Sequence, residues 1–146
     1  MYKVLAIFIS IAAIYFISKS NSPSIQPSAT NLGHPLLGSW KLHSTNYDGT
    51  WISNEATKSL KHFTPTHFTW VDINEGNGVV TAIGGGGVDF ADGYYVESIN
   101  YAKGASIEKL LGVKVEFQWE IIDGFFHQRG TFPDGFYIHE KWARIK

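Results

Sequence analysis

The sequence contains no cysteine. This absence excludes disulfide bonds, thiolate metal ligands, a cysteine nucleophile and a lipid anchor attached to cysteine. A charge of one sign is also lacking, because 12 Lys and Arg against 13 Asp and Glu give a formal net charge of −1. No run of basic residues forms a local positive field, so nucleic acid is not an expected partner.

Motifs for metals, phosphates and cofactors are missing as well. Neither His-x-His nor His-Glu-x-x-His occurs, so the spacing of the histidines predicts no metal site, and we expect no cofactor. The glycine run Gly84–Gly87 is not followed by Lys-Ser or Lys-Thr. We therefore interpret it as a place where a strand bends or bulges, and not as a phosphate-binding loop.

One long apolar run is present, and it lies at the N-terminus. Val4–Ile17 is almost wholly apolar and follows the basic residue Lys3. This layout predicts a signal peptide over residues 1–20, with an uncleaved membrane anchor as the alternative, although the run is shorter than the ~20 residues of a typical spanning helix. Residues 21–34 are rich in Ser, Pro and Asn and are predicted to be a disordered spacer. We expect a secreted or periplasmic protein, or one tethered by this segment.

Aromatic residues and glycine are abundant. Ten Phe, seven Tyr and five Trp make up 15% of the 146 residues, and there are 15 Gly. Val113–Ile121 alternates between apolar and polar residues without a fault, which predicts a half-buried strand. Asp123-Gly124 then predicts a tight turn into a strand over Phe125–Thr131, and a second turn signal precedes Phe136–Ile145.

Five more strand candidates lie upstream, separated by Asp-Gly and glycine-rich turns: Gly38–Thr45, Phe63–Ile73, Val79–Ile83, Val88–Phe90 and Tyr94–Tyr101. Only Ala105–Leu111 has a helical pattern, and it is one or two turns long. About eight short antiparallel strands must form a sandwich or a closed barrel to protect their edges. Residues 35–146 are therefore predicted to form one all-β domain.

A family resemblance favours the barrel. Gly38 and Trp40 open the first strand and Arg144 closes the last, which resembles the lipocalin and calycin pattern. In that pattern the arginine packs on the tryptophan ring through a cation–π contact. The resemblance implies an antiparallel, up-and-down, lipocalin-like barrel of about eight strands with at most one short helix.

Interior motifs are similar to those of small secreted bacterial lipocalin-like proteins of unassigned function. The matching segments are residues 64–70 (TPTHFTW), the glycine run, Tyr95-Val96-Glu97 with Ile99, and Glu140-Lys141-Trp142. The resemblance covers nearly all of residues 36–145. It implies fold and export but supplies no catalytic residue.

Strand alternation places two carboxylates inside the barrel. Glu140 shares a face with Ile138 and Trp142, and Glu97 shares a face with Tyr95, Ile99 and Tyr101. Because an isolated buried charge is costly, each carboxylate needs a partner.

The strand over residues 125–131 is expected to supply these partners. His127 and Arg129 do so if they face inward with Phe125, and the alternative is that Phe126, Gln128 and Gly130 face inward. His67 lies on the face opposite to Phe68 and Trp70 and is expected outside.

These residues predict a protein that binds a small, mostly apolar molecule inside the barrel. The predicted ligand-binding residues combine aromatic walls with fixed polar groups: Phe68, Trp70, Tyr95, Glu97, Phe117, Trp119, His127, Arg129 and Glu140. One alternative is a small barrel enzyme of the isomerase or cyclase type, in which Glu97 or Glu140 acts with His127 as general acid or base. Another is a filled barrel whose interior ion pairs are structural and whose outer surface is an interaction module.

Overall fold

The structure is a computed structural model that describes residues 33–146 except 54, 105 and 106. The predicted signal peptide (1–20) and all but the last two residues of the predicted spacer (21–34) lie outside the described residues. Within the described part, no helix is long and apolar enough to cross a membrane.

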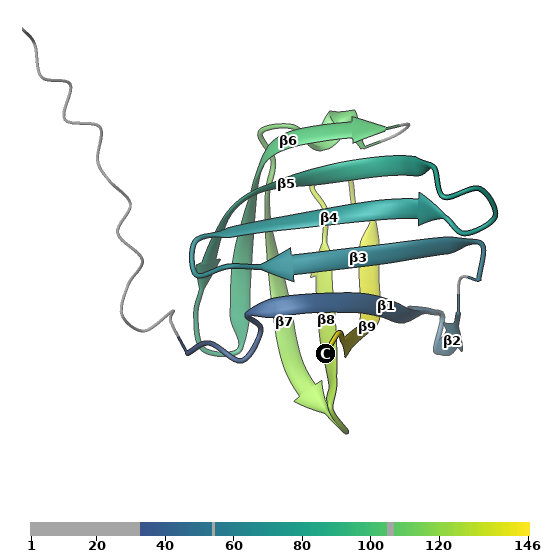
Figure 1. The fold of residues 1–146 in the computed structure, drawn as a ribbon. Helices are drawn as coiled ribbons and strands as arrows, with labels where there is room; N and C mark the ends of the chain where they lie inside the picture. Colours follow the sequence, from purple (N-terminus) through teal and green to yellow (C-terminus); the bar gives the residue numbers. More distant parts are fainter. Residues whose placement is uncertain (1–32, 54, 105–106) are drawn as a thin grey trace, which may run out of the picture.

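The described chain consists almost entirely of strands (Figure 1). The strands are β1 (Gly38–Tyr47), β2 (Thr50–Ile52), β3 (Thr57–Phe63), β4 (His67–Asn74), β5 (Val80–Phe90), β6 (Tyr94–Gly104), β7 (Lys114–Ile122), β8 (Phe125–Thr131) and β9 (Tyr137–Arg144). Among the described residues between β6 and β7, Glu108–Leu110 form a 3-10 turn, η2, inside the segment with the predicted helical pattern.

The strands form one closed barrel. They are hydrogen-bonded in the order β2-β1-β3-β4-β5-β6-β7-β8-β9, and β1 also pairs with β9. Eight antiparallel strands therefore close the barrel, while the short β2 pairs with the end of β1. The predicted fold class, an all-β up-and-down barrel of about eight strands, is confirmed.

Three strand assignments differ from the prediction. β3 begins at Thr57, before the predicted start at Phe63. Its first residues (TKSL) carry no apolar–polar alternation, so the sequence does not mark the start of this strand. Residues 64–66 separate β3 from β4, so the predicted strand over Phe63–Ile73 contains the end of one strand and nearly all of the next. Apart from Val79, the two predicted strands at Val79–Ile83 and Val88–Phe90 belong to one continuous strand, β5.

The glycine run lies where β5 and β6 turn a corner of the barrel (Figure 1). A Cβ atom at Gly84 would overlap the Trp70 ring, and one at Gly86 would overlap the backbone carbonyl of Ser98. The pairing with β6 shifts by one residue between Gly85 and Gly86, as expected for a bulge. This shift places Tyr101 outside, so its predicted inward position is wrong.

The predicted contact between Trp40 and Arg144 closes one end of the barrel. The Arg144 guanidinium carbon lies 4.1 Å from the centre of the Trp40 ring. The indole nitrogen of Trp40 donates to the Leu36 carbonyl at 2.8 Å, and Arg144 donates to the carbonyls of Leu37, at 2.7 Å, and Pro35. The arginine thus ties the segment before β1 to the last strand.

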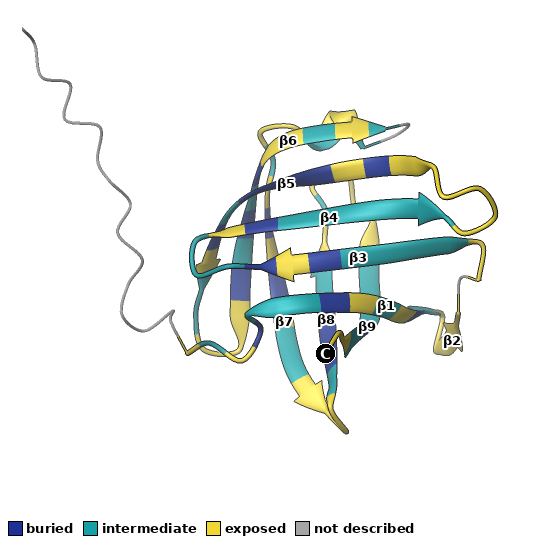
Figure 2. Ribbon diagram, viewed as in Figure 1, coloured by how far each residue is buried: buried dark blue, intermediate teal, exposed yellow. Residues whose placement is uncertain are grey.

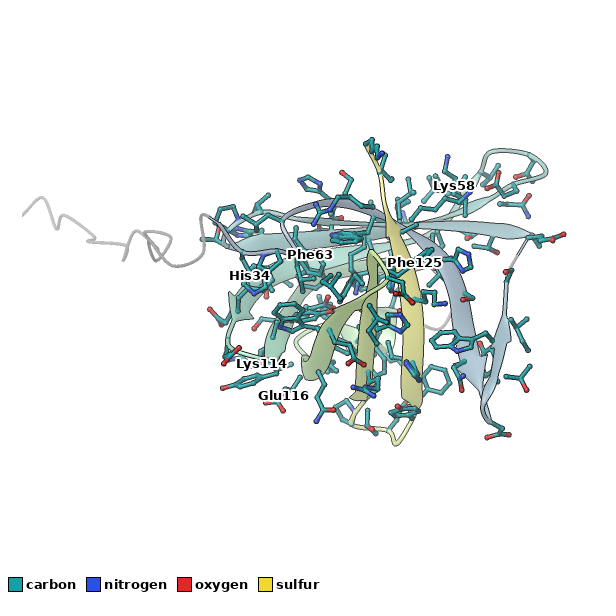
Figure 3. The ribbon with its side chains drawn as sticks, turned by 90° about the horizontal axis from the view of Figure 1, so that it is seen from below. His34, Lys58, Phe63, Lys114, Glu116 and Phe125 are labelled. Carbon is teal, nitrogen blue, oxygen red and sulfur yellow. The ribbon has the colours of Figure 1, made fainter. Side chains whose placement is uncertain are left out.

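Aromatic residues fill the barrel next to this closed end. Phe63 lies inside and packs edge-on against Tyr95 and Phe126, with ring centroids 5.4 Å and 6.1 Å apart. In Figure 3, Phe63 points into the barrel while Lys114 and Glu116 project from the outer surface. Figure 2 shows the same alternation along the strands, with buried residues between exposed ones.

Candidate functional site

A cavity of about 450 Å³ lies in the barrel interior. None of the residues that close the Trp40 end lines it; its rim includes η2 and the loop between β8 and β9. Most of its wall is apolar and aromatic, with Trp70, Ile99, Phe117, Phe132, Ile138 and Trp142 among the lining residues. Its volume lies within the range of about 300–1,000 Å³ that is usual for small-molecule sites.

A buried lysine is the centre of a polar network in the wall of this cavity. Lys61, which is only 6% exposed, donates from Nζ to Glu97 Oε1 at 2.9 Å and to Gln128 Oε1 at 3.0 Å. Its ammonium group also lies 5.4 Å from the ring centres of Phe117 and Trp142. Lys61 therefore neutralises Glu97 inside an otherwise aromatic surrounding.

Gln128 connects this ion pair to the second interior carboxylate. Its Oε1 also accepts from the Tyr95 hydroxyl at 2.6 Å, and its Nε2 donates to Glu140 Oε2 at 2.6 Å. The same Glu140 oxygen accepts from the indole nitrogen of Trp142 at 3.1 Å. A neutral amide can bridge the two sites because it carries both a donor and an acceptor.

Burial changes the proton affinity of this network. It raises the pKa of Glu97 and of Glu140, and the positive charge of Lys61 partly opposes the rise in both. The pKa of Tyr95 is raised well above its ordinary value, first by burial and then by the charges of the two carboxylates. Both glutamates therefore hold a proton more tightly in the folded protein than in the unfolded chain.

This difference predicts a pH effect on stability that depends on Glu140. Because the pKa of Glu140 is higher in the folded state, the unfolded chain ionises first as the pH rises, which favours unfolding. We expect the free energy of unfolding of the wild type to fall relative to that of Glu140→Gln as the pH rises from about 4 through the folded-state pKa of Glu140. Urea denaturation of both proteins across this range measures it, and a relative rise would contradict the burial argument.

The predicted inward orientation of His127 and Arg129 is wrong. Phe126, Gln128 and Gly130 face the interior, as in the alternative orientation. Phe126 packs on Trp40, and Gly130 lies where the Phe117 ring leaves no room for a side chain. These packing constraints fix the face of β8, and they are stronger than the charge pairing used for the prediction.

The outward residues of β8 have partners on the outer surface. Arg129 forms an ion pair with Glu120 of β7 at 3.0 Å. His127 is buried because Trp51 of β2 packs edge-on against it, with ring centroids 5.6 Å apart. Burial, with the charge of Lys141, lowers the pKa of His127. His127 therefore does not meet Glu97 or Glu140 inside the barrel.

The other predicted site residues divide between the cavity and the packed end of the barrel. Trp70, Glu97, Phe117 and Glu140 line the cavity. Three more do not line it: Phe68, Tyr95 and Trp119. Phe68 and Tyr95 are buried in the core. Trp119 packs against His34, which precedes β1. His67 is exposed on the outer surface, as expected.

Two important residues of the site were not predicted from the sequence, Lys61 and Gln128. Lys61 shares a face of β3 with Phe63, and this alternation was the available signal. It was missed because the strand was placed too late in the sequence. Gln128 belonged to the alternative face of β8. No group of three or more His, Asp or Glu residues in the described ranges could hold a metal ion.

Comparisons with known proteins add fold information. The structure is similar to the crystal structure of an uncharacterized protein from Bacteroides eggerthii, with a TM-score of 0.52 and 16% sequence identity. The match covers 75% of this chain and 99% of that protein. No known protein family and no curated protein matches the sequence. At this identity the similarity concerns the barrel fold alone.

Proposed function

We propose that this protein is an exported, lipocalin-like binding protein that takes a small, mostly apolar molecule into the barrel cavity. One observation carries the proposal: a cavity of about 450 Å³ combines aromatic and aliphatic walls with a fixed network of polar side chains. Apolar walls supply affinity through burial, and a few fixed polar groups orient the ligand.

The polar network supports binding because its side chains hold one another in place. Lys61, Glu97, Gln128 and Glu140 are joined by hydrogen bonds of 2.6–3.0 Å and belong to four different strands. A ligand therefore does not need to order these side chains, which lowers the entropy cost of binding. The presence of the cavity also argues against the alternative of a filled barrel.

The cavity can be tested with a fluorescent apolar probe, N-phenyl-1-naphthylamine. The wild type is expected to bind it, with energy transfer from Trp70 and Trp142 in the cavity wall. Ile138→Trp replaces an aliphatic side chain of the cavity wall by a larger indole ring. It is expected to weaken binding by about tenfold or more, since the probe and the indole compete for the same volume.

A matched control lies one residue away on the same strand. Tyr137 is exposed on the outer face of β9, so Tyr137→Trp adds the same indole outside the barrel and is expected to leave binding unchanged. Equal binding by both variants, or a wild type that does not bind the probe, would refute binding in the cavity. Circular dichroism of each variant checks that the barrel is folded.

Membership of the lipocalin group and export rest on separate observations. The Trp40–Arg144 contact and the eight-strand closure support the first. The basic and then apolar layout of residues 1–20 supports export. The denatured mass of the protein recovered from an exported fraction tests cleavage directly, and native mass spectrometry of the same sample detects a ligand that is lost on denaturation.

A further inference from the structure

The charged residues that line the cavity are unequal in number. Two are cationic, Lys61 and Lys109, and four are acidic, Asp72, Glu97, Asp134 and Glu140. Each lysine is already paired with a carboxylate. Lys61 lies 2.9 Å from Glu97 inside the barrel, and Lys109 lies 2.6 Å from Asp134 at the exposed rim. Asp72 and Glu140 are therefore the two cavity carboxylates that neither lysine pairs with.

Neither of these two carboxylates forms an ion pair with any residue that the structure describes. Glu140 accepts its hydrogen bonds from neutral donors, the Gln128 amide and the Trp142 indole, and both go to the same oxygen. Burial raises the pKa of Glu140, the more distant charge of Lys61 lowers it, and the negative charges of Glu97 and Asp72 add to the rise. With two lysines against four carboxylates, the cavity wall has an excess of acidic groups, and the two that no lysine pairs lie on β4 and β9.

Aromatic rings surround the same space. Trp70, Phe117 and Trp142 line the cavity, and their ring faces attract cations electrostatically. Phe117 and Trp142 already lie 5.4 Å from the ammonium group of Lys61. Carboxylates with aromatic rings are a combination that suits an organic cation, whereas an anionic ligand would have to lie beside Asp72 and Glu140.

We propose that the cavity selects an organic amine, in which an ammonium group is carried on an apolar body and pairs with Glu140 and Asp72. This inference rests on the proposed function and specifies its ligand class. The ammonium group supplies the missing positive charge, and the apolar body lies against the aromatic wall. A charge-assisted hydrogen bond to a carboxylate is stronger than the bond that a neutral hydroxyl makes to the same group.

Three naphthalene derivatives of similar shape test this selectivity by isothermal titration calorimetry at neutral pH. They are 1-naphthylmethylamine, a cation at this pH, 1-naphthylmethanol, which is neutral, and the carboxylate anion 1-naphthaleneacetate. We expect the amine to bind about tenfold or more tightly than the alcohol, and the carboxylate to bind weakest. An alcohol or carboxylate that binds as tightly as the amine would overturn the inference.

Two variants identify the source of the preference. Glu140→Gln keeps the shape of the side chain and an acceptor oxygen, so it is expected to weaken amine binding more than alcohol binding and to reduce the preference for the amine to within about threefold. Asp72→Asn is expected to reduce it in the same direction, and it serves as the test if the first variant does not fold. A preference that survives both substitutions together would overturn the inference.

A matched control removes one negative charge elsewhere. Glu120→Gln changes the net charge by the same amount on the outer surface, where Glu120 pairs with Arg129, and is expected to keep the full preference. The result also separates this inference from the proposed function. If N-phenyl-1-naphthylamine binds and Ile138→Trp blocks it while the amine shows no preference, the ligand class alone is wrong. If the wild type binds neither that probe nor any naphthalene derivative, the binding function is wrong.

Discussion

Replacing Lys61 by methionine is expected to lower the free energy of unfolding by about 3–5 kcal/mol at neutral pH. The substitution keeps much of the side-chain volume but removes the cation that lies 2.9 Å from Glu97. Glu97 is only 3% exposed, so its carboxylate is poorly solvated once this partner is lost. The remaining buried charge, and not the lost attraction, accounts for most of this cost.

The expected loss depends on pH in a defined direction. Without Lys61, the folded-state pKa of Glu97 rises further above its value in the unfolded chain, because the lysine lowers that pKa in the wild type. The destabilisation is therefore greatest above the folded-state pKa and shrinks as the pH falls toward about 4, where both states are protonated. Urea denaturation at several pH values measures it.

Two further variants isolate the buried charge. Adding Glu97→Gln to Lys61→Met is expected to recover part of the lost stability, because the double variant buries a neutral amide. Lys103→Met removes a lysine from the outer face of β6 and is expected to change stability by less than about 0.5 kcal/mol. A double variant that is less stable than Lys61→Met would contradict the argument from an unpaired carboxylate.

Replacing Trp40 by alanine is expected to cost about 3–5 kcal/mol of unfolding free energy. Its side chain is only 1% exposed, and it packs between Phe126, with ring centroids 5.3 Å apart, and the Arg144 guanidinium. The substitution leaves a cavity at the closed end and also removes the donor to the Leu36 carbonyl. Thermal or urea unfolding monitored by circular dichroism gives the difference.

A tryptophan at the rim of the sheet provides the control. Trp51 on β2 is 37% exposed, and Trp51→Ala is expected to cost much less than Trp40→Ala. Trp40→Phe keeps an aromatic ring against Arg144 and is expected to lose less stability than the alanine variant. Similar losses for Trp40→Ala and Trp51→Ala would mean that the closed end does not depend on the buried indole.

Much of the barrel could be predicted from the sequence because strand alternation is a local property. The alternation over Val113–Ile121 predicts β7 to within a residue at each end, and the Asp123-Gly124 turn predicts its hairpin with β8. Trp40 and Arg144 predict which strands meet when the barrel closes. The same alternation gives the inward positions of Glu97 and Glu140. Export stays a prediction, because residues 1–20 lie outside the described part.

The face of β8 could not be decided from its own sequence. Both of its faces carry one phenylalanine and at least one hydrogen-bonding residue, so alternation has no preference there. Packing decided it, since Gly130 must lie beside the Phe117 ring and Phe126 beside Trp40. Arg129 then lies outside, where Glu120 is its partner.

The sequence by itself determined the all-β class and the two interior carboxylates, because both depend on strand alternation, which is local. The closed barrel and the contact between Trp40 and Arg144 followed from the family resemblance. Only the tertiary structure decided which groups meet inside the barrel. Lys61 and Glu97 are 36 residues apart and Lys61 and Gln128 are 67 apart, and barrel closure brings all three within hydrogen-bond distance. The cavity is likewise a property of the closed barrel, because its lining residues come from strands that are far apart in the sequence.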